Sequence, residues 1–304
     1  MTAASLELAQ VRAGGAVVPV VLHDGEPRDL RPLGLRDLLA LIESGERGLD
    51  SVREAVAAGS LPPVTPDTPG VWVAPILRPP RNVFCVGANY VGHVAEGQHG
   101  AAGMGSVPTI FTKPATCLRG AGEPVDIHSA ATGMADWEGE IAFVIGRAGK
   151  DIAPAAALRH VFGFTLANDV SARDMQRNGG FSRPQWFKGK SLDGFLPLGP
   201  RLVVGDPAEL IARIGFEVLL NGETVQKAEL GQLYFDIPAI ISYLSRGMML
   251  LPGDVVLTGT PEGVGVFRSP PRFLRGGDVV TVRSTERSSE LGELTTPFVD
   301  LAAE

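Results

Sequence analysis

Short apolar segments alternate with turns along most of the chain, and this pattern predicts many short strands. β-branched and aromatic residues recur in brief runs that glycine, proline or polar residues bound on both sides. Two segments, 154–160 and 237–245, instead have the spacing of helices. The pattern favours a β-rich α+β protein. The strands that we expect after the first 60 residues cover 82–86, 109–112, 138–145, 162–169, 214–220, 254–258 and 278–282.

The first part of the chain has its own pattern. A β-branched run at 15–22 predicts a strand, and apolar spacing at 35–42 and 50–58 predicts two helices. Residues 61–70 then contain four prolines, which suit neither a helix interior nor a strand ladder. We therefore predict a small α/β N-terminal domain with a proline-rich linker over residues 1–75, and a second, main domain over 76–304.

Composition narrows the class of protein. Gly (38) and Pro (24) make up about a fifth of the 304 residues, which argues against a helical bundle. A net charge of −7 makes nucleic acid a poor partner. The two cysteines have no C-x-x-C spacing, which excludes a disulfide scaffold and suits a reducing compartment. No apolar run is long enough for a membrane span, and the start lacks a secretory signal. We expect a soluble, cytoplasmic protein with no membrane partner.

Acidic residues stand out at the ends of two predicted strands. Strand alternation places Glu138 and Glu140 on one face, and Asp169 ends the apolar run 162–169. Three carboxylates form an oxygen ligand set that suits Mg²⁺, Mn²⁺ or Ca²⁺ better than zinc. Spacing does not show that the two strands are neighbours, so exposed strand ends with solvated acids are the alternative.

Lysine is scarce, so a lysine in an apolar context is a candidate for chemistry. Lys190 follows Trp186 and Phe187, and Lys113 follows a short apolar run. A lysine near acidic groups can polarise a carbonyl or move a proton, whereas the alternative is a surface lysine whose stem packs on apolar neighbours. The segment Gly189–Ser191 is not a phosphate-binding P-loop, because Pro184 stands where that motif needs glycine.

A histidine and a glutamate three residues apart, His93 and Glu96, can share one face of a helical turn. A carboxylate that holds an imidazole makes a general base, although such a pair is often an ordinary surface contact. The glycine-rich stretch that follows, 97–107, is a candidate lid or a plain loop. We expect this stretch and the irregular segment 177–185 to set the specificity for the substrate. The turn Thr258-Gly259-Thr260-Pro261 offers N–H and O–H donors to a carboxylate, or is simply a turn after a strand.

Taken in order, these segments resemble the fumarylacetoacetate hydrolase family. The resemblance runs from Arg78 to the C-terminus, and it is specific because the order and spacing of several motifs agree together. The matching stretches are Gly87-x-Asn89-Tyr90-x-x-His93-x-x-Glu96, Phe111-x-Lys113-Pro114, Glu138-x-Glu140, Asn168-Asp169-x-Ser171-Ala172-Arg173-Asp174-x-Gln176, Gly189-Lys190-Ser191-x-Asp193 and Thr258-Gly259-Thr260-Pro261.

The resemblance implies a mixed β-roll catalytic core and a homodimer that acts on a small 2-oxo or 1,3-diketo acid. It implies Mg²⁺ or Mn²⁺ held by Glu138, Glu140 and Asp169. It also implies a catalytic dyad, His93 with Glu96, which activates water near Lys190. The substrate contacts that it implies are Arg173, Gln176, Thr260 and Lys113. One departure is Asn89, because some hydrolases of the family carry a further metal-side carboxylate near this position.

The chemistry of the family leaves a choice of reactions. A metal that chelates a 2-oxo acid stabilises the enolate that hydrolysis, decarboxylation and isomerisation share. Hydrolysis also needs an activated water, which the His93–Glu96 pair would supply. We therefore expect a metal-dependent hydrolase that cleaves a C–C bond of an acylpyruvate. The alternatives are an isomerase or decarboxylase on a hydroxymuconate- or oxaloacetate-type diacid, and a non-catalytic metal- or ligand-binding β-protein.

Overall fold

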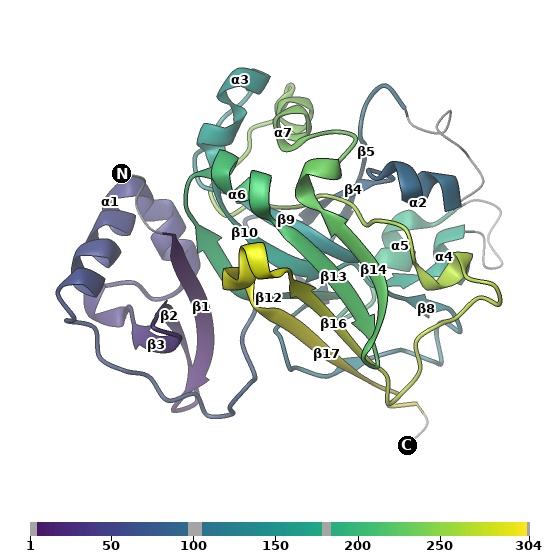
Figure 1. The fold of residues 1–304 in the computed structure, drawn as a ribbon, viewed down its shortest axis with the longest axis horizontal. Helices are drawn as coiled ribbons and strands as arrows, with labels where there is room; N and C mark the ends of the chain where they lie inside the picture. Colours follow the sequence, from purple (N-terminus) through teal and green to yellow (C-terminus); the bar gives the residue numbers. More distant parts are fainter. Residues whose placement is uncertain (1–4, 97–104, 178–183, 303–304) are drawn as a thin grey trace.

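The structure, a computed structural model, describes residues 5–96, 105–177 and 184–302. Within these residues the chain forms one large mixed sheet, a second sheet that packs against it, and a small two-stranded ribbon (Figure 1). The expected β-rich α+β class is confirmed. In spatial order the large sheet holds β3 (Glu26–Asp29), β2 (Ala16–His23), β1 (Leu6–Ala13), β12 (Leu196–Val204), β10 (Val161–Asn168), β9 (Gly139–Ile145), β15 (Val255–Leu257), β4 (Val83–Gly87) and β5 (Thr109–Lys113), with β6 (Leu118–Arg119) beside β12.

The small ribbon pairs β8 (Ala135–Asp136) with β11 (Ser171–Ala172). The second sheet covers one face of the large sheet. The second sheet holds, in order, β14 (Glu223–Glu229), β13 (Gly215–Leu220), β16 (Val279–Ser284), β17 (Glu293–Val299) and β7 (Val125–Asp126).

Strand β9 lies at the centre of the core and is buried along its whole length. Ile141, Phe143 and Ile145 join the apolar core shared with the second sheet. Ala142 and Val144 point to the opposite face and join the core beneath the N-terminal elements. Burial on both faces explains why β9 reads as a continuous apolar run after its acidic start.

The helices lie around the two sheets. Helix α1 contains a kink at Gly45, whose φ of 61° and ψ of −148° lie outside the helical region and favour glycine. The two helices expected at 35–42 and 50–58 are thus the two arms of one kinked element. The helix bounds are α1 (Leu38–Ala57), α2 (Val91–Glu96), α3 (Pro154–Ala157), α4 (Arg173–Arg177), α5 (Trp186–Lys190), α6 (Pro207–Arg213) and α7 (Ile237–Ser245).

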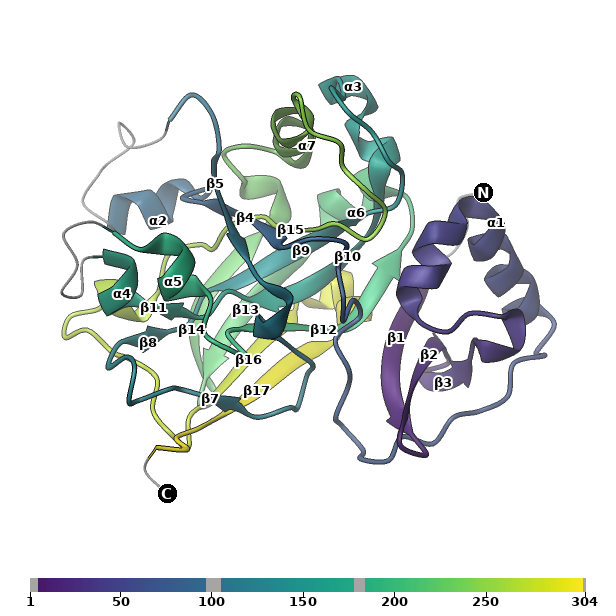
Figure 2. The same cartoon turned by 180° about the vertical axis from the view of Figure 1, so that it is seen from behind.

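The N-terminal strands continue the large sheet. β1 pairs antiparallel with β12, from Leu6 opposite Val204 to Ala9 opposite Arg201. The proline-rich stretch 61–70 contains no helix and no named strand. The division of the chain near residue 75 stays a prediction, since the sheet itself runs across it. At the end of the molecule far from β1–β3, α2, α4 and α5 gather beside the ribbon (Figure 2).

Candidate active site

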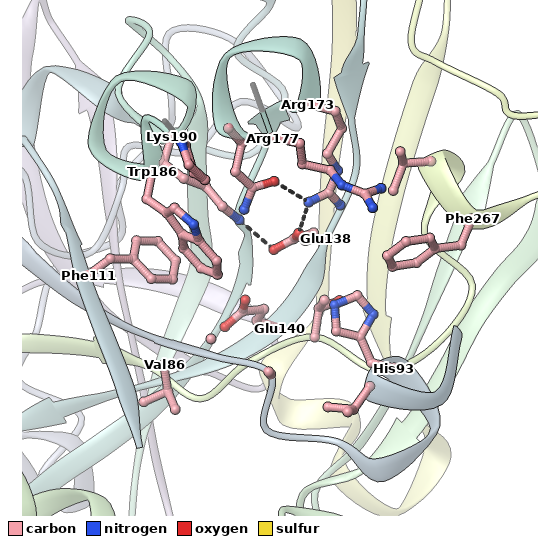
Figure 3. A pocket seen from close by; sticks show the side chains of 17 residues that line it. Val86, His93, Phe111, Glu138, Glu140, Arg173, Arg177, Trp186, Lys190 and Phe267 are labelled. Carbon is pink, nitrogen blue, oxygen red and sulfur yellow. Dashed lines mark hydrogen bonds and ion pairs between the residues drawn. The ribbon is translucent and has the colours of Figure 1, made fainter. Parts of the chain in front are cut away.

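A cavity of about 320 Å³ opens where α2, α4 and α5 meet the large sheet. Its walls come from segments far apart in the sequence, because strand pairing brings the ends of β4, β9 and β15 to one place. Figure 3 shows Glu138 and Glu140 in the middle of the cavity, Phe111 and Trp186 on one side, and His93 and Phe267 on the other.

Three buried carboxylates form the floor of this site. β9 and β10 are antiparallel, with Glu140 opposite Ala167, so the start of β9 meets the end of β10. The backbone N–H of Asp169 donates to the carbonyl of Glu138 at 2.8 Å. One oxygen from each of Glu138, Glu140 and Asp169 lies within 4.8 Å of the others. The acids that the sequence could not place together are therefore a single cluster.

Two of the three acids are paired with buried cations. Lys190 Nζ lies 2.6 Å from Glu138 Oε2 and 2.7 Å from Asp169 Oδ2. Arg173 Nη1 lies 2.6 Å from Glu138 Oε1, and Lys113 Nζ lies 2.6 Å from Asp169 Oδ1. Burial alone would raise the pKa of Glu138, but the charges of Lys190 and Arg173 outweigh it and hold that pKa below the usual range.

Lys190 is charged for a related reason. Burial opposes its charge, but the carboxylates of Asp169 and Glu138 outweigh burial and raise the pKa of the ammonium. Lys190 is therefore a fixed positive charge in the wall of the cavity.

Glu140 differs from its two neighbours. Among the described residues it has no lysine or arginine partner, and Oε2 accepts only the backbone N–H of Gly259, at 2.7 Å. Burial, followed by the charges of Asp169 and Glu138, raises the pKa of Glu140 well above its usual value. A divalent cation would remove this repulsion, and the donors are all carboxylate oxygens, as Mg²⁺ and Mn²⁺ prefer. The cluster thus fits a divalent metal.

The histidine and glutamate predicted as a dyad lie together on α2. His93 Nδ1 is 3.4 Å from Glu96 Oε2, and Glu96 Oε1 accepts the backbone N–H of Gly263 at 2.6 Å. The Glu96 contact engages Nδ1 and leaves Nε2 of His93 for a bound molecule. His93 lines the cavity, whereas Glu96 stands behind it. This arrangement suits proton transfer at the cavity wall.

Three of the four predicted substrate contacts line the cavity: Arg173, Gln176 and Thr260. Arg173 Nη1 donates to Gln176 Oε1 at 2.9 Å, and Thr260 Oγ1 donates to the carbonyl of Gly139 at 2.9 Å. Lys113 is not among the lining residues. It lies behind Asp169, fully buried, and donates also to the carbonyl of Val170 at 3.0 Å. Its contacts suit orientation of the Asp169 carboxylate.

Asp136 is a site residue that the sequence reasoning missed. It is completely buried, and Oδ2 accepts from Arg173 Nε at 2.8 Å and from the backbone N–H of Val266 at 3.0 Å. Oδ1 accepts the N–H of Gly265 at 2.7 Å. Asp136 thereby fixes both Arg173 and the 3₁₀ turn Gly265–Phe267. The available signal was a fourth acid beside Glu138 and Glu140 in the sequence.

Asn89, the departure from the hydrolase pattern, is a structural residue here. It is buried, and Nδ2 donates to the carbonyls of Phe235, at 3.0 Å, and Thr258, at 2.8 Å. Oδ1 accepts the N–H of Phe235 at 2.7 Å. A carboxylate could not donate these bonds, so this position holds two loops together.

The two segments expected to set specificity lie largely outside the described residues. The candidate lid, 97–107, is described only from residue 105, and the stretch 177–185 lacks 178–183. Both stay predictions.

The fold and the site define a β-rich α+β protein whose cavity combines a carboxylate cluster that fits a divalent cation with the His93–Glu96 pair. The chain belongs to the fumarylacetoacetate hydrolase family, since the family described as "Fumarylacetoacetate (FAA) hydrolase C-terminal" matches residues 82–299. The family resemblance seen in the motifs is confirmed.

Relatives and solved structures extend this result. "Oxaloacetate tautomerase fahd2, mitochondrial" of Xenopus laevis is 37% identical over 95% of this chain and 85% of its own length. The human "Oxaloacetate tautomerase FAHD2A, mitochondrial" is 42% identical over 88% of this chain and 80% of its own. The structure of fumarylacetoacetate hydrolase EaFAH from Exiguobacterium antarcticum has a TM-score of 0.82 at 35% identity, covering 97% of this chain and 99% of that one. A 5-carboxymethyl-2-hydroxymuconate delta-isomerase from Mycobacterium smegmatis has a TM-score of 0.70 at 31% identity, covering 97% and 98%.

The expected C–C bond hydrolase is wrong. The relatives of 37% and 42% identity are tautomerases, and one of the similar structures is an isomerase. EaFAH bears the hydrolase name but is less similar in sequence than these relatives. The physical reason for the error is that a histidine held by a glutamate can move a proton to carbon as readily as it can activate water. The dyad therefore did not discriminate between the two reactions.

Proposed function

We propose that this chain is a tautomerase that interconverts the enol and keto forms of a 2-oxo diacid of the oxaloacetate type. The observation that carries the proposal is the imidazole of His93, held by Glu96, in the wall of a cavity floored by Glu138, Glu140 and Asp169. The tautomerase relatives support the same reaction.

The three carboxylates would hold Mg²⁺ or Mn²⁺, with Ca²⁺ as a further oxygen-liganded ion. When bound, the cation would polarise the 2-oxo group and so lower the energy of the enolate.

The residues of the chain supply the proton transfer. In the enol-to-keto direction the O2 hydroxyl releases its proton to solvent, His93 adds a proton at C3, and the C2–C3 double bond becomes a C2–O2 double bond. Solvent then returns a proton to His93. His93 Nε2 is the donor to C3, because Glu96 engages Nδ1 and orients the ring. Lys190 stabilises negative charge that develops on the oxo acid. Arg173, Gln176 and Thr260 orient the acid against His93.

The decay of enol absorbance of oxaloacetate tests this function directly. Wild-type protein with Mg²⁺ should accelerate ketonisation, and EDTA should remove the acceleration. His93→Ala should lower kcat at least about 100-fold, whereas His23→Ala, an exposed histidine on β2, should change nothing. Equal rates for His93→Ala and wild type would refute the proposal. Mn²⁺ binding without turnover of any acid would instead indicate a binding protein.

A second candidate is isomerisation of a longer hydroxymuconate-type diacid, which the isomerase from Mycobacterium smegmatis favours. It needs the same proton donor, with the proton delivered further along a conjugated chain. A substrate panel with product analysis separates the two reactions, and release of CO₂ would identify a decarboxylase.

The homodimer and the cytoplasmic location remain predictions. Light scattering would test the homodimer. No helix among the described residues is long and apolar enough to cross a membrane.

A further inference from the structure

The positively charged groups that line the cavity differ in whether they already have an acidic partner. Lys190 contacts Glu138 and Asp169, and Arg173 contacts Glu138 and Asp136. Arg177 also lines the cavity, but within the described ranges it has no hydrogen bond to a carboxylate and no ion pair. Its guanidinium therefore retains its capacity for an anion.

Helix geometry places Arg177 on the same side of α4 as the buried Arg173. The two residues are four positions apart, so their side chains leave the same face of the helix. Arg173 reaches inward to the carboxylates, and Arg177 stays exposed near the outer part of the cavity wall. The two arginines thus serve the inner and outer parts of one cavity.

The guanidinium of Arg177 lies over the aromatic ring of Phe267. Its Cζ lies 5.1 Å from the centroid of the Phe267 ring, a cation–π contact. The same ring lies 5.9 Å from the imidazole of His93 (Figure 3). Asp136 fixes the turn that carries Phe267 by accepting the N–H groups of Gly265 and Val266. One rigid turn therefore sets the position of Arg177 relative to the proposed proton donor.

The charges within the cavity determine where a second carboxylate can lie. Glu138 and Glu140 make the inner part acidic, so a divalent cation there would bind only one end of a 2-oxo acid. A second carboxylate on the same molecule is repelled by these acids and needs a cation further out. A guanidinium presents paired N–H donors that match a carboxylate in charge and geometry.

We propose that Arg177, supported on Phe267, binds the distal carboxylate of the substrate and makes the site selective for dicarboxylic over monocarboxylic 2-oxo acids. This inference rests on the proposed function, because it assumes that a 2-oxo acid occupies the cavity.

The test compares a dianionic and a monoanionic substrate, the enols of oxaloacetate and phenylpyruvate. Arg177→Met removes the charge and keeps most of the stem. It should raise KM for oxaloacetate by about 10- to 100-fold, the loss expected for one charge-assisted contact, with little change in kcat. KM for phenylpyruvate should not rise. Arg177→Lys should recover part of the loss. The matched control is Arg246→Met, which removes another arginine that lies over an aromatic ring, Tyr243.

A loss that is equal for both substrates, or no loss for oxaloacetate, would overturn the inference. A binding measurement keeps the test independent of turnover: calorimetry with malate and lactate in the presence of Mg²⁺. Wild type should prefer malate, and Arg177→Met should abolish that preference while Arg246→Met keeps it. If wild type ketonises neither enol, the proposed function fails. The malate preference and its loss in Arg177→Met still decide the role of Arg177.

Discussion

Glu140→Gln is the most direct test of the carboxylate cluster, because the same substitution should act in opposite directions with and without metal. Glu140 is buried beside Glu138 and Asp169 and has no cationic partner among the described residues. Glutamine has nearly the same shape, and its side-chain oxygen can still accept the N–H of Gly259. The substitution therefore removes a charge and little else.

The size of the effect follows from the geometry. Two unit charges at the cluster's limiting separation of 4.8 Å repel by about 3 kcal/mol at an effective dielectric constant of 20. Glu140 has two such neighbours, but the charge of Lys190 offsets part of the repulsion. We expect Glu140→Gln to raise the free energy of unfolding by about 1–3 kcal/mol in EDTA at pH 8. That gain corresponds to a rise in Tm of roughly 2–5 °C for a chain of 304 residues.

Bound metal should reverse the order of stability, so that wild type becomes more stable than Glu140→Gln. At a Mn²⁺ concentration about 1,000-fold above Kd, wild type gains about 4.1 kcal/mol, whereas Glu140→Gln has lost a ligand and gains less. Thermal melts of both proteins in EDTA and in a Mn²⁺ series measure this crossing. The control Glu217→Gln alters a carboxylate paired with Arg283 and should respond to Mn²⁺ as wild type does. A destabilised Glu140→Gln in EDTA, or equal gains from Mn²⁺, would refute the reasoning.

Three further substitutions test other parts of the site and fold. Asp136→Asn breaks the buried ion pair with Arg173, so the free energy of unfolding, measured in urea, should fall by about 3–5 kcal/mol. The value of kcat/KM for enol-oxaloacetate, measured by enol decay, should fall about 10-fold or more. An unchanged KM would contradict the role of Asp136 in orienting Arg173. Asn89→Asp loses two donated hydrogen bonds and should cost about 2–4 kcal/mol in urea unfolding, while a neutral result would mean that the loops do not need the amide. Burial raises the pKa of Asp254 above its ordinary 3.8. The contribution of Asp254 to stability is therefore present below pH 3.8 and is lost as the pH rises through the raised pKa. Asp254→Asn should make the free energy of unfolding less dependent on pH in this range. Identical slopes of unfolding free energy against pH in wild type and Asp254→Asn would refute this prediction.

Local patterns in the sequence predicted the acidic strand well. Glu138 and Glu140 precede a run of apolar residues, and β9 begins at Gly139 as the alternation suggests. The helical spacing of His93 and Glu96 likewise places both residues on α2. These features depend on residues close in the chain, where side-chain period decides the structure.

Features that depend on distant residues were less accessible. The contact of Asp169 with Lys113 joins residues 56 positions apart, and no pattern of neighbouring residues predicts it. Strand β12 was missed because Pro197, Gly199 and Pro200 interrupt its apolar pattern. The reaction itself could not be read from His93 and Glu96, since the same pair serves hydrolysis and tautomerisation.

The pairing of β1 with β12 has a consequence for shortened forms of the chain. One side of β12 is bonded to β10, and the other side is shared by β6 near Leu196 and β1 near Val204. A chain that starts at residue 76 would leave the β1 side of β12 as an open edge with buried-type residues such as Leu202 newly exposed. Open apolar edges recruit strands from other molecules. We therefore expect a chain without its first 75 residues to aggregate more readily than the full chain.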